Sequence, residues 1–242
     1  MISTVSEQSQ RFLIDVLCLI GIIGNVCLCE IIAVHKMMNN ADVIPVPPFV
    51  SPLAVVDESS SLAAGVKIWH FSQIREGVIL GENCIVSKDV YIGPGVKIGA
   101  NSKIQNAVQI HDPAEIQNGV FLGPNVIITN DKVPRASGRD GSALNSSEWH
   151  KVGTTVKEGA SIGAGSTIIS PCIIGSWSLI GAGSVVTKNV PDHAMVYGNP
   201  AKFVNWVGFS GEILEADDGF WVSPISGERF QEVKGGLIYE KS

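Results

Sequence analysis

Charge is scarce in this 242-residue chain, and the charges that are present do not cluster. Only 17% of the residues are Asp, Glu, Lys or Arg, and the formal net charge is −6. Because the sequence contains no block of Lys or Arg residues, we expect no nucleic-acid surface. The five histidines are scattered and lack the spacing of a metal-binding set, so no metal site is expected either.

Cysteine is also sparse. None of the five cysteines has the paired spacing of a disulfide framework or of a zinc site. Cys84 and Cys172 fall at small, inward positions of a six-residue repeat, so we expect them to be buried, reduced thiols. This usage favours a reducing compartment, and the sequence therefore predicts a cytoplasmic protein.

Residues 1–47 lack the repeat that organises the rest of the chain. Residues 12–34 are strongly apolar, but Asp15 and Glu30 are charges that a membrane-spanning helix would bury at a cost. The segment has neither the basic start nor the small-residue cleavage site of a signal peptide. Three interpretations stay open: a membrane-associated helix, a poorly ordered extension, or a cleaved signal. The Pro-rich stretch 44–48 separates this segment from the repeat region.

The dominant feature of the sequence is a six-residue period. Every sixth residue is a branched aliphatic: Val50, Val56, Leu62, Ile68, Ile74, Leu80, Val86, Ile92, Ile98, Ile104, Ile110, Ile116, Leu122 and Ile128. The fourth residue after each of the first thirteen is small or β-branched. A period of six fits neither a helix nor an alternating strand, but it fits a chain that turns a corner every six residues. Three such turns make an 18-residue coil, so the sequence predicts a parallel β-helix of stacked coils.

The repeat stops at Ile128 and resumes out of phase at Val156, leaving a polar insertion over residues 129–155. A solenoid tolerates an insertion at a corner because each coil contacts only its neighbours. Long polar loops are often functional, although a surface loop without a role is the alternative. The polar residues that suggest binding are Asn130, Asp131, Lys132, Arg135, Trp149 and His150.

These boundaries predict three parts. We expect an N-terminal extension and linker over residues 1–47, a β-helix domain over 48–204, and a C-terminal extension over 205–242. Residues 18 apart should lie one above the other, which places Asn130 over Asp112 and gathers His111 and Asp131 at the same corner. Asn106 falls at a different corner, so only a neighbouring subunit could bring it to this cluster.

The sequence resembles the hexapeptide-repeat acyltransferases, whose β-helix is left-handed. The motifs that narrow the resemblance are Ile68–Phe71, Lys103–Asn106, Gly119–Pro124, Thr129–Lys132, Pro134–Ala136, Gly198–Lys202 and Ser223–Phe230. They are most similar to UDP-2-acetamido-3-amino-2,3-dideoxy-glucuronate N-acetyltransferases of surface-polysaccharide synthesis. The resemblance implies a homotrimer that transfers an acetyl group from acetyl-CoA to the 3-amino group of a nucleotide-linked sugar.

The resemblance also implies roles for particular residues. Asn130 is expected beside the acceptor amine, with Asp131 or His111 as the group that takes its proton. Lys132 and Arg135 suit a phosphate or carboxylate of the acceptor. The other expected acceptor-binding residues are Trp69, His70 and Asn106. For each of these side chains, a purely structural or solvent-exposed role is the alternative.

The donor is expected along the later coils. Two Gly-Ala-Gly corners lie 18 residues apart, and their small residues would let a pantetheine arm approach the backbone. The residues assigned to them are Gly163, Ala164, Gly165, Gly181, Ala182 and Gly183. Lys188 and Lys202 are expected to meet the CoA phosphates.

Two other functions stay open. A hexapeptide O-acetyltransferase acting on serine or a sugar hydroxyl would share the coil, but it would depend on an acceptor-side histidine, and the segment 129–135 favours the amino-sugar enzymes. A non-catalytic or γ-carbonic-anhydrase-like relative would need metal histidines at subunit corners, which the scattered histidines do not supply.

Overall fold

The computed structural model describes residues 45–144 and 151–240. These residues form 26 strands, and no part of them is a helix that could cross a bilayer. The all-β fold class predicted from the six-residue period is therefore confirmed. The apolar segment 12–34, Trp149 and His150 lie outside the described residues.

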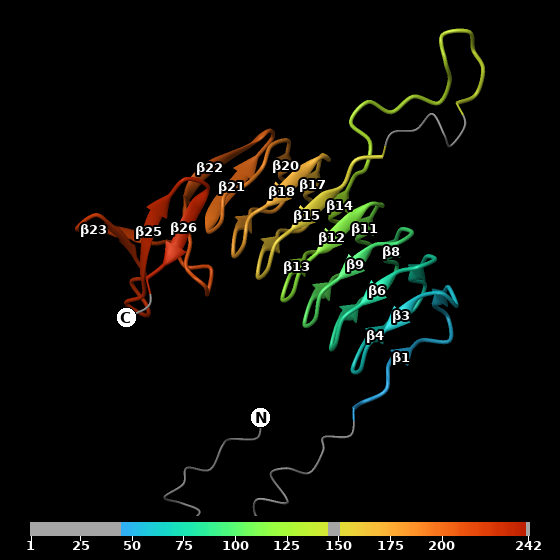
Figure 1. Ribbon diagram of the computed structural model, residues 1–242, viewed down its shortest axis with the longest axis horizontal. Coiled ribbons are helices and arrows are strands. Elements are labelled where there is room, and N and C mark those ends of the chain that lie inside the picture. The colour runs from blue at the N-terminus through green and yellow to red at the C-terminus, as the bar shows by residue number, and fades with distance from the viewer. Residues whose placement is uncertain (1–44, 145–150, 241–242) are drawn as a thin grey trace, which may run out of the picture. The chain divides into compact units, whose positions relative to one another are not determined.

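Three parallel sheets form the sides of the coil (Figure 1). Sheet A contains β1 (Phe49–Val50), β4 (Lys67–Ile68), β7 (Ile85–Val86), β10 (Lys103–Ile104), β13 (Phe121–Leu122), β16 (Ser161–Ile162), β19 (Leu179–Ile180), β21 (Ala194–Gly198) and the antiparallel β22 (Ala201–Trp206). Sheet B contains β2 (Val55–Val56), β5 (Gln73–Ile74), β8 (Tyr91–Ile92), β11 (Gln109–Ile110), β14 (Ile127–Ile128), β17 (Thr167–Ile168) and β20 (Val185–Val186). Sheet C contains β3 (Ser61–Leu62), β6 (Ile79–Leu80), β9 (Lys97–Ile98), β12 (Ala114–Ile116), β15 (Thr154–Val156) and β18 (Cys172–Ile174).

The strand register confirms the predicted 18-residue coil. Ile104 pairs with Val86 on one side and with Leu122 on the other. Across the insertion the offset grows, since Leu122 pairs with Ile162. The chain thus leaves the coil after β14, returns at β15 and continues the same three sheets, as in a left-handed β-helix of hexapeptide repeats.

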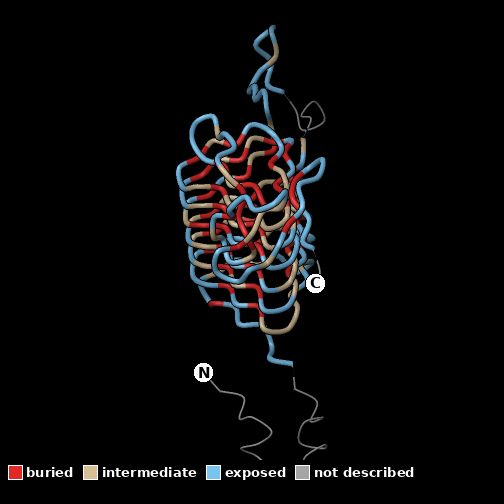
Figure 2. The backbone as a smooth tube through the Cα atoms, turned by 90° about the vertical axis from the view of Figure 1, so that its left-hand side faces the viewer, coloured by how far each residue is buried: buried red, intermediate tan, exposed pale blue. Residues whose placement is uncertain are grey.

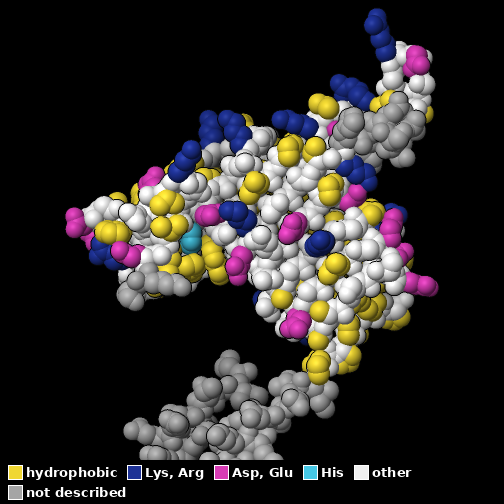
Figure 3. Space-filling model, viewed as in Figure 1, with side chains coloured by type: hydrophobic (Ala, Val, Ile, Leu, Met, Phe, Trp, Pro, Cys, Tyr) yellow, Lys and Arg dark blue, Asp and Glu magenta, His cyan; other side chains and the backbone are white. Residues whose placement is uncertain are grey.

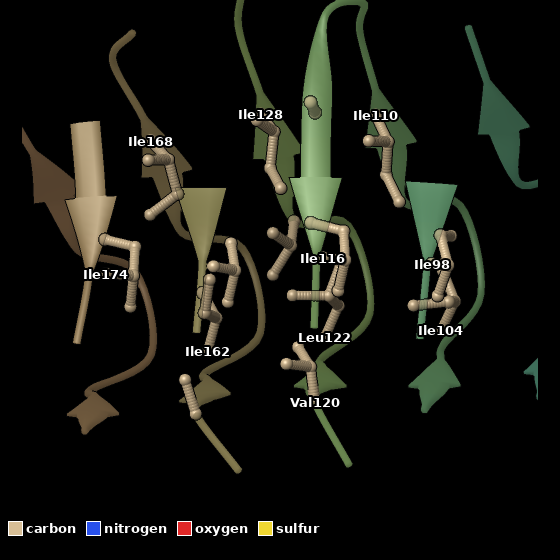
Figure 4. Packing of buried hydrophobic residues seen from close by; sticks show 14 of the residues in the cluster. Ile98, Ile104, Ile110, Ile116, Val120, Leu122, Ile128, Ile162, Ile168 and Ile174 are labelled. Carbon is tan, nitrogen blue, oxygen red and sulfur yellow. The ribbon is translucent and has the colours of Figure 1, made fainter. Parts of the chain in front are cut away.

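The core is the set of inward aliphatic columns. Figure 4 shows the isoleucines of the three sheets converging on the axis, and Figure 2 shows buried positions inside the coil and exposed ones outside it. Ile104 and Ile110 are fully buried, whereas Val50, in the first coil, is 38% exposed. Hydrophobic side chains gather over the β1 end of the coil in Figure 3. The predicted buried thiols are confirmed: Cys84 and Cys172 are free and buried, and burial raises the pKa of Cys172 to about 11.

A small antiparallel sheet follows the coil. It contains β23 (Glu215–Asp217), β24 (Phe220–Val222), β25 (Arg229–Val233) and β26 (Gly236–Tyr239). Asp192, which follows the last coil, donates from its N–H to Gly235 O and accepts from Leu237 N–H at 3.1 and 3.2 Å. The buried ring of Phe230 packs 4.9 Å from that of His193. The C-terminal extension therefore packs against the end of the coil.

Candidate functional site

The corners between sheet A and sheet B stack into one continuous edge, termed here the A/B edge: residues 69–71, 87–89, 105–107, 123–125, 163–165 and 181–183. Backbone hydrogen bonds join successive corners, for example from Ala107 N–H to Lys88 O at 2.9 Å. The third residue of every corner has a positive φ, from 58° to 70°. Glycine and asparagine adopt this conformation most readily, which explains Gly165, Gly183 and Asn125 at this position.

Three predicted acceptor-binding residues lie on the early part of this edge. An open groove of about 410 Å³ is lined by Trp69, His70, Phe71, Ser87, Lys88 and Asn106. Trp69 is 42% exposed and Phe71 is 62% exposed. Lys88 was not among the predicted residues, although it lies 18 residues after His70 and 18 before Asn106, so the register alone could have identified it.

The Gly-Ala-Gly corners lie on the later part of the same edge. Gly183 N–H donates to Ala164 O at 2.8 Å, which confirms that the two corners stack. A Cβ at Gly163 would lie 2.5 Å from Ala182 N, so that position admits no side chain. By contrast, no atom lies within 4 Å of a Cβ built at Gly165 or at Gly183. Bare backbone is thus accessible there, which fits the close approach of a narrow pantetheine arm.

The predicted catalytic residues lie on a different edge, between sheets B and C. Asn130 Nδ2 donates to Asp112 O at 2.7 Å, as the 18-residue register predicts, and Asn130 is only 7% exposed. The His111 ring lies 5.4 Å from the ring of Tyr91. Asp131 Oδ1 accepts a hydrogen bond at 2.8 Å from the backbone N–H two residues later. His111, Asp112, Asn130 and Asp131 therefore gather at one corner, here termed the B/C cluster.

The end of the insertion contacts the residues at its start, and these contacts hold the insertion at the B/C cluster. Lys151 Nζ lies 2.5 Å from Asp112 Oδ2, and Val152 N–H donates to Asn130 O at 3.0 Å. Asp112 thus holds both the side chain of Asn130, through its carbonyl, and the returning strand, through its carboxylate. Lys151 was not singled out from the sequence because its partner is 39 residues away and on the other side of the insertion.

The predicted cationic residues are spread over several elements. Lys132 and Arg135 are exposed on the insertion, where Arg135 donates from Nη1 to Pro134 O at 2.8 Å. Lys188 lies between β20 and sheet C, and its carbonyl accepts from Cys172 Sγ at 3.1 Å. Within one chain it is therefore on the B/C side and not beside the Gly-Ala-Gly corners with which it was grouped.

Lys202 lies closer to those corners. It pairs with Tyr197 across β21 and β22. A Cβ at Gly181 would lie 2.7 Å from Tyr197 Cβ, so Tyr197 continues the column one coil further on. The structure therefore separates the predicted residues of one chain into two sets, an A/B set with the groove and the Gly-Ala-Gly corners, and the B/C cluster.

Other grooves do not coincide with the predicted residues. One of about 490 Å³ lies over sheet C and includes Lys97, Glu115 and Asn118. In the described part of the chain, no group of three His, Cys, Asp or Glu side chains is arranged to hold a metal ion.

Parts of the coil are similar to known proteins. Residues 95–130 and 153–188 match the bacterial transferase hexapeptide (six repeats) family. A 54-residue segment is 56% identical to the dTDP-3-amino-3,6-dideoxy-alpha-D-galactopyranose 3-N-acetyltransferase of Aneurinibacillus thermoaerophilus, covering 22% of this chain and 28% of that protein. A 52-residue segment is 46% identical to serine acetyltransferase 4 of Arabidopsis thaliana, covering 22% of this chain and 15% of that protein. The chain thus spans less than a third of the length of either relative.

Some solved structures are similar to parts of the chain, with TM-scores below 0.5. A GDP-perosamine N-acetyltransferase variant from Caulobacter crescentus, in complex with CoA and GDP-perosamine, has a TM-score of 0.46 at 23% identity, over 66% of this chain and 58% of that one. The acetyltransferase domain of PglB from Neisseria gonorrhoeae has a TM-score of 0.44 at 20% identity, over 70% and 64%. The repeat match and the three-sheet coil show that this part of the chain is similar to the bacterial transferase hexapeptide repeats.

Proposed function

We propose that this protein is an acetyl-CoA-dependent N-acetyltransferase that acetylates the 3-amino group of a nucleotide-linked amino sugar. The observation that carries the proposal is the A/B edge, where an aromatic groove is followed by bare Gly-Ala-Gly backbone. The segment shared with a 3-amino-sugar 3-N-acetyltransferase supports the choice of acceptor. The motif resemblance is to enzymes of surface-polysaccharide synthesis, and the buried free thiols support a cytoplasmic location.

Acetyl transfer to an amine makes three demands on the chain. The amine must be neutral, the developing oxyanion needs hydrogen-bond donors, and the reactants must be held in line. The thioester supplies an already activated acyl group, so positioning carries much of the rate. Asn130 cannot act as a base. Its Nδ2 is held by Asp112 O, and its amide oxygen would accept a hydrogen bond from the sugar amine. Asp131 or His111 would take the proton.

We further propose that the protein is a homotrimer in which sheet B packs between copies. The outward side chains of sheet B carry no charge: Val55, Gln73, Tyr91, Gln109, Ile127, Thr167 and Val185. Sheet A presents Lys67 and Lys103, and sheet C presents Lys97 and Glu115. Interface cores are depleted of charge, so sheet B is the favoured face. Because sheet B separates the two edges, packing it around an axis would bring the A/B edge of one copy beside the B/C cluster of the next.

The direct test is to incubate the purified protein with acetyl-CoA and a panel of acceptors while free thiol is followed. We expect thiol release with 3-amino sugar nucleotides only. The serine acetyltransferase match makes an O-acetyltransferase the second candidate. Thiol release with serine or a hydroxyl sugar would support that candidate instead, and no release with any acceptor would favour a non-catalytic protein.

The role of Asn130 can be tested by Asn130→Ala. We expect turnover to fall by about 100-fold, because a small misplacement of the amine slows attack strongly. Oligomeric state and acetyl-CoA binding should stay as in the wild type. Unchanged turnover would refute the assigned role, and the pH–rate profile of His111→Ala would separate a base from a bystander.

A further inference from the structure

We infer that the groove on the A/B edge binds a nucleoside diphosphate lengthwise, with the base against Trp69 and Phe71, the diphosphate at Lys88 and the attached sugar at Asn106. The sugar end of this arrangement rests on the proposed function. The base and diphosphate end does not, and it can be tested with a plain nucleotide.

The backbone at Phe71 is the first observation. Phe71 occupies the corner position that requires a positive φ, and its φ is 64°. The other corners of this edge place Gly, Asn, Asp or Ala there. A bulky residue in this conformation costs the folded chain stability. Because the ring is 62% exposed, hydrophobic burial of Phe71 does little to offset that cost. Strain of this kind at an exposed aromatic points to a binding role.

A second exposed aromatic lies at the same corner. Trp69 keeps 42% of its surface accessible, and its ring lies 5.4 Å from that of Phe49. His70 lies between the two aromatics in sequence, with ring centroids 6.4 Å from Trp69 and 6.2 Å from Phe71. Nucleobases stack on such exposed rings whichever base is present, because every base is planar and aromatic. The first corner of the groove therefore suits a nucleobase.

The polar residues follow in a fixed order along the edge. Asp89 N–H donates to His70 O and Ala107 N–H donates to Lys88 O, so Lys88 lies one coil beyond the aromatic corner and Asn106 lies one coil beyond Lys88. Each coil advances by about 4.8 Å. Asp89 Oδ2 holds Lys88 Nζ at 2.7 Å, which uses one of the three N–H donors of the ammonium.

This order matches the covalent order of a nucleotide sugar. Aromatic rings, a cation and an amide follow one another as base, diphosphate and sugar do. Asn106 is also the end of the groove that lies nearer the Gly-Ala-Gly corners, two coils further along the same edge. A sugar amine at Asn106 would therefore face the donor, with the base pointing away from it.

The test is isothermal titration of the full chain with UDP, dTDP and GDP. We expect at least one of the three to bind, and Trp69→Ala to weaken that binding by about tenfold. Lys88→Met should weaken binding of the diphosphate while leaving the affinity for the free nucleoside unchanged. Matched controls are Phe121→Ala and Lys67→Met, which change exposed residues of sheet A outside the groove; neither should alter binding.

Phe71→Asn distinguishes a binding role of Phe71 from a purely structural one. Asparagine suits φ 64°, so we expect the melting temperature to rise by about 2–4 °C while nucleotide affinity falls. Loss of affinity together with loss of stability, wild-type affinity in Trp69→Ala, or absence of binding for all three nucleotides would overturn the inference. If the protein acetylates an amino sugar nucleotide but the groove variants bind nucleotide normally, the inference fails and the proposed function stands. If the groove variants lose nucleotide affinity but the wild type transfers no acetyl group, only the proposed function fails.

Discussion

His193 is a single buried residue whose ionisation affects the junction between the coil and the C-terminal sheet. It is 4% exposed, and Nδ1 lies 2.9 Å from Val207 O. The ring packs 5.2 Å from that of Phe209. Burial lowers the pKa of the imidazole, although the contact with Val207 O and the charges of Asp192 and Glu212 act in the opposite direction. The neutral ring is therefore the form that the folded protein favours.

We expect this residue to make the protein less stable in mild acid. Because the pKa of His193 is lower in the folded than in the unfolded chain, the unfolded chain binds the proton first as the pH falls below about 6.5. The stabilisation is fully present above that pH and is lost as the pH falls toward the folded pKa. His193→Asn tolerates the positive φ and keeps a donor for Val207 O. Urea unfolding at pH 7.5 and 5.5 should show a smaller loss of stability in the variant, and an equal loss would contradict the assignment.

At the scale of one element, the Gly-Ala-Gly corner can be altered without disturbing the coil. Asn125 precedes Gly165 by one coil at the same corner position, with φ 59° against 69°. An asparagine at Gly165 therefore suits the backbone and has open space for its side chain. We predict that Gly165→Asn melts within about 2 °C of the wild type. Its amide would cover the backbone on which the pantetheine arm is proposed to lie, so the KM for acetyl-CoA should rise by about tenfold.

A matched control is Gly119→Asn, on the edge between sheets C and A. Gly119 also has a positive φ, 66°, and its nearest neighbours would lie 3.9 Å from an added Cβ. We expect its KM for acetyl-CoA to equal that of the wild type. If Gly165→Asn and Gly119→Asn behave alike in steady-state kinetics, the donor does not lie on the A/B edge.

The strands of the coil could be predicted from the sequence because each one contributes an inward aliphatic at a fixed spacing. The position of Ile104 in the six-residue repeat, for example, predicts both its burial and its pairing with Val86 and Leu122. The C-terminal sheet could not be predicted in this way. Its strands pair antiparallel through residues such as Phe230 and Tyr239, which have no repeating partner in the sequence.

The same reasoning explains the outcome for the candidate site. The stacking of Asn130 on Asp112 was predictable because both residues are inside the 18-residue register. Within one chain Lys188 lies apart from the Gly-Ala-Gly corners, because those corners are on the A/B edge whereas Lys188 lies one strand further along, past sheet B. Lys151 was missed because it approaches Asp112 only through the return of the insertion. Spacing predicts contacts between coils, and it does not predict contacts that a loop makes.

At the scale of the whole molecule, the separation of the two edges makes the proposed activity depend on assembly. The A/B edge and the B/C cluster lie on opposite sides of sheet B in one chain. A complete site would then need two copies, with residues such as Asn106 and Asn130 contributed by different chains. The uncharged outer face of sheet B is the surface through which we propose that the copies meet.

Two threonines test this arrangement as a matched pair. Thr167 is an outward residue of sheet B and Thr155 is an outward residue of sheet C, and both are partly exposed. Thr167→Lys would place like charges from each copy near the shared axis with no partner, which an interface tolerates poorly. We expect light scattering to show a monomer for Thr167→Lys and a trimer for Thr155→Lys, with thiol release reduced at least about tenfold only in the former. Since both variants add the same charge to the same kind of strand, a trimeric and active Thr167→Lys would show that the copies do not pack through sheet B.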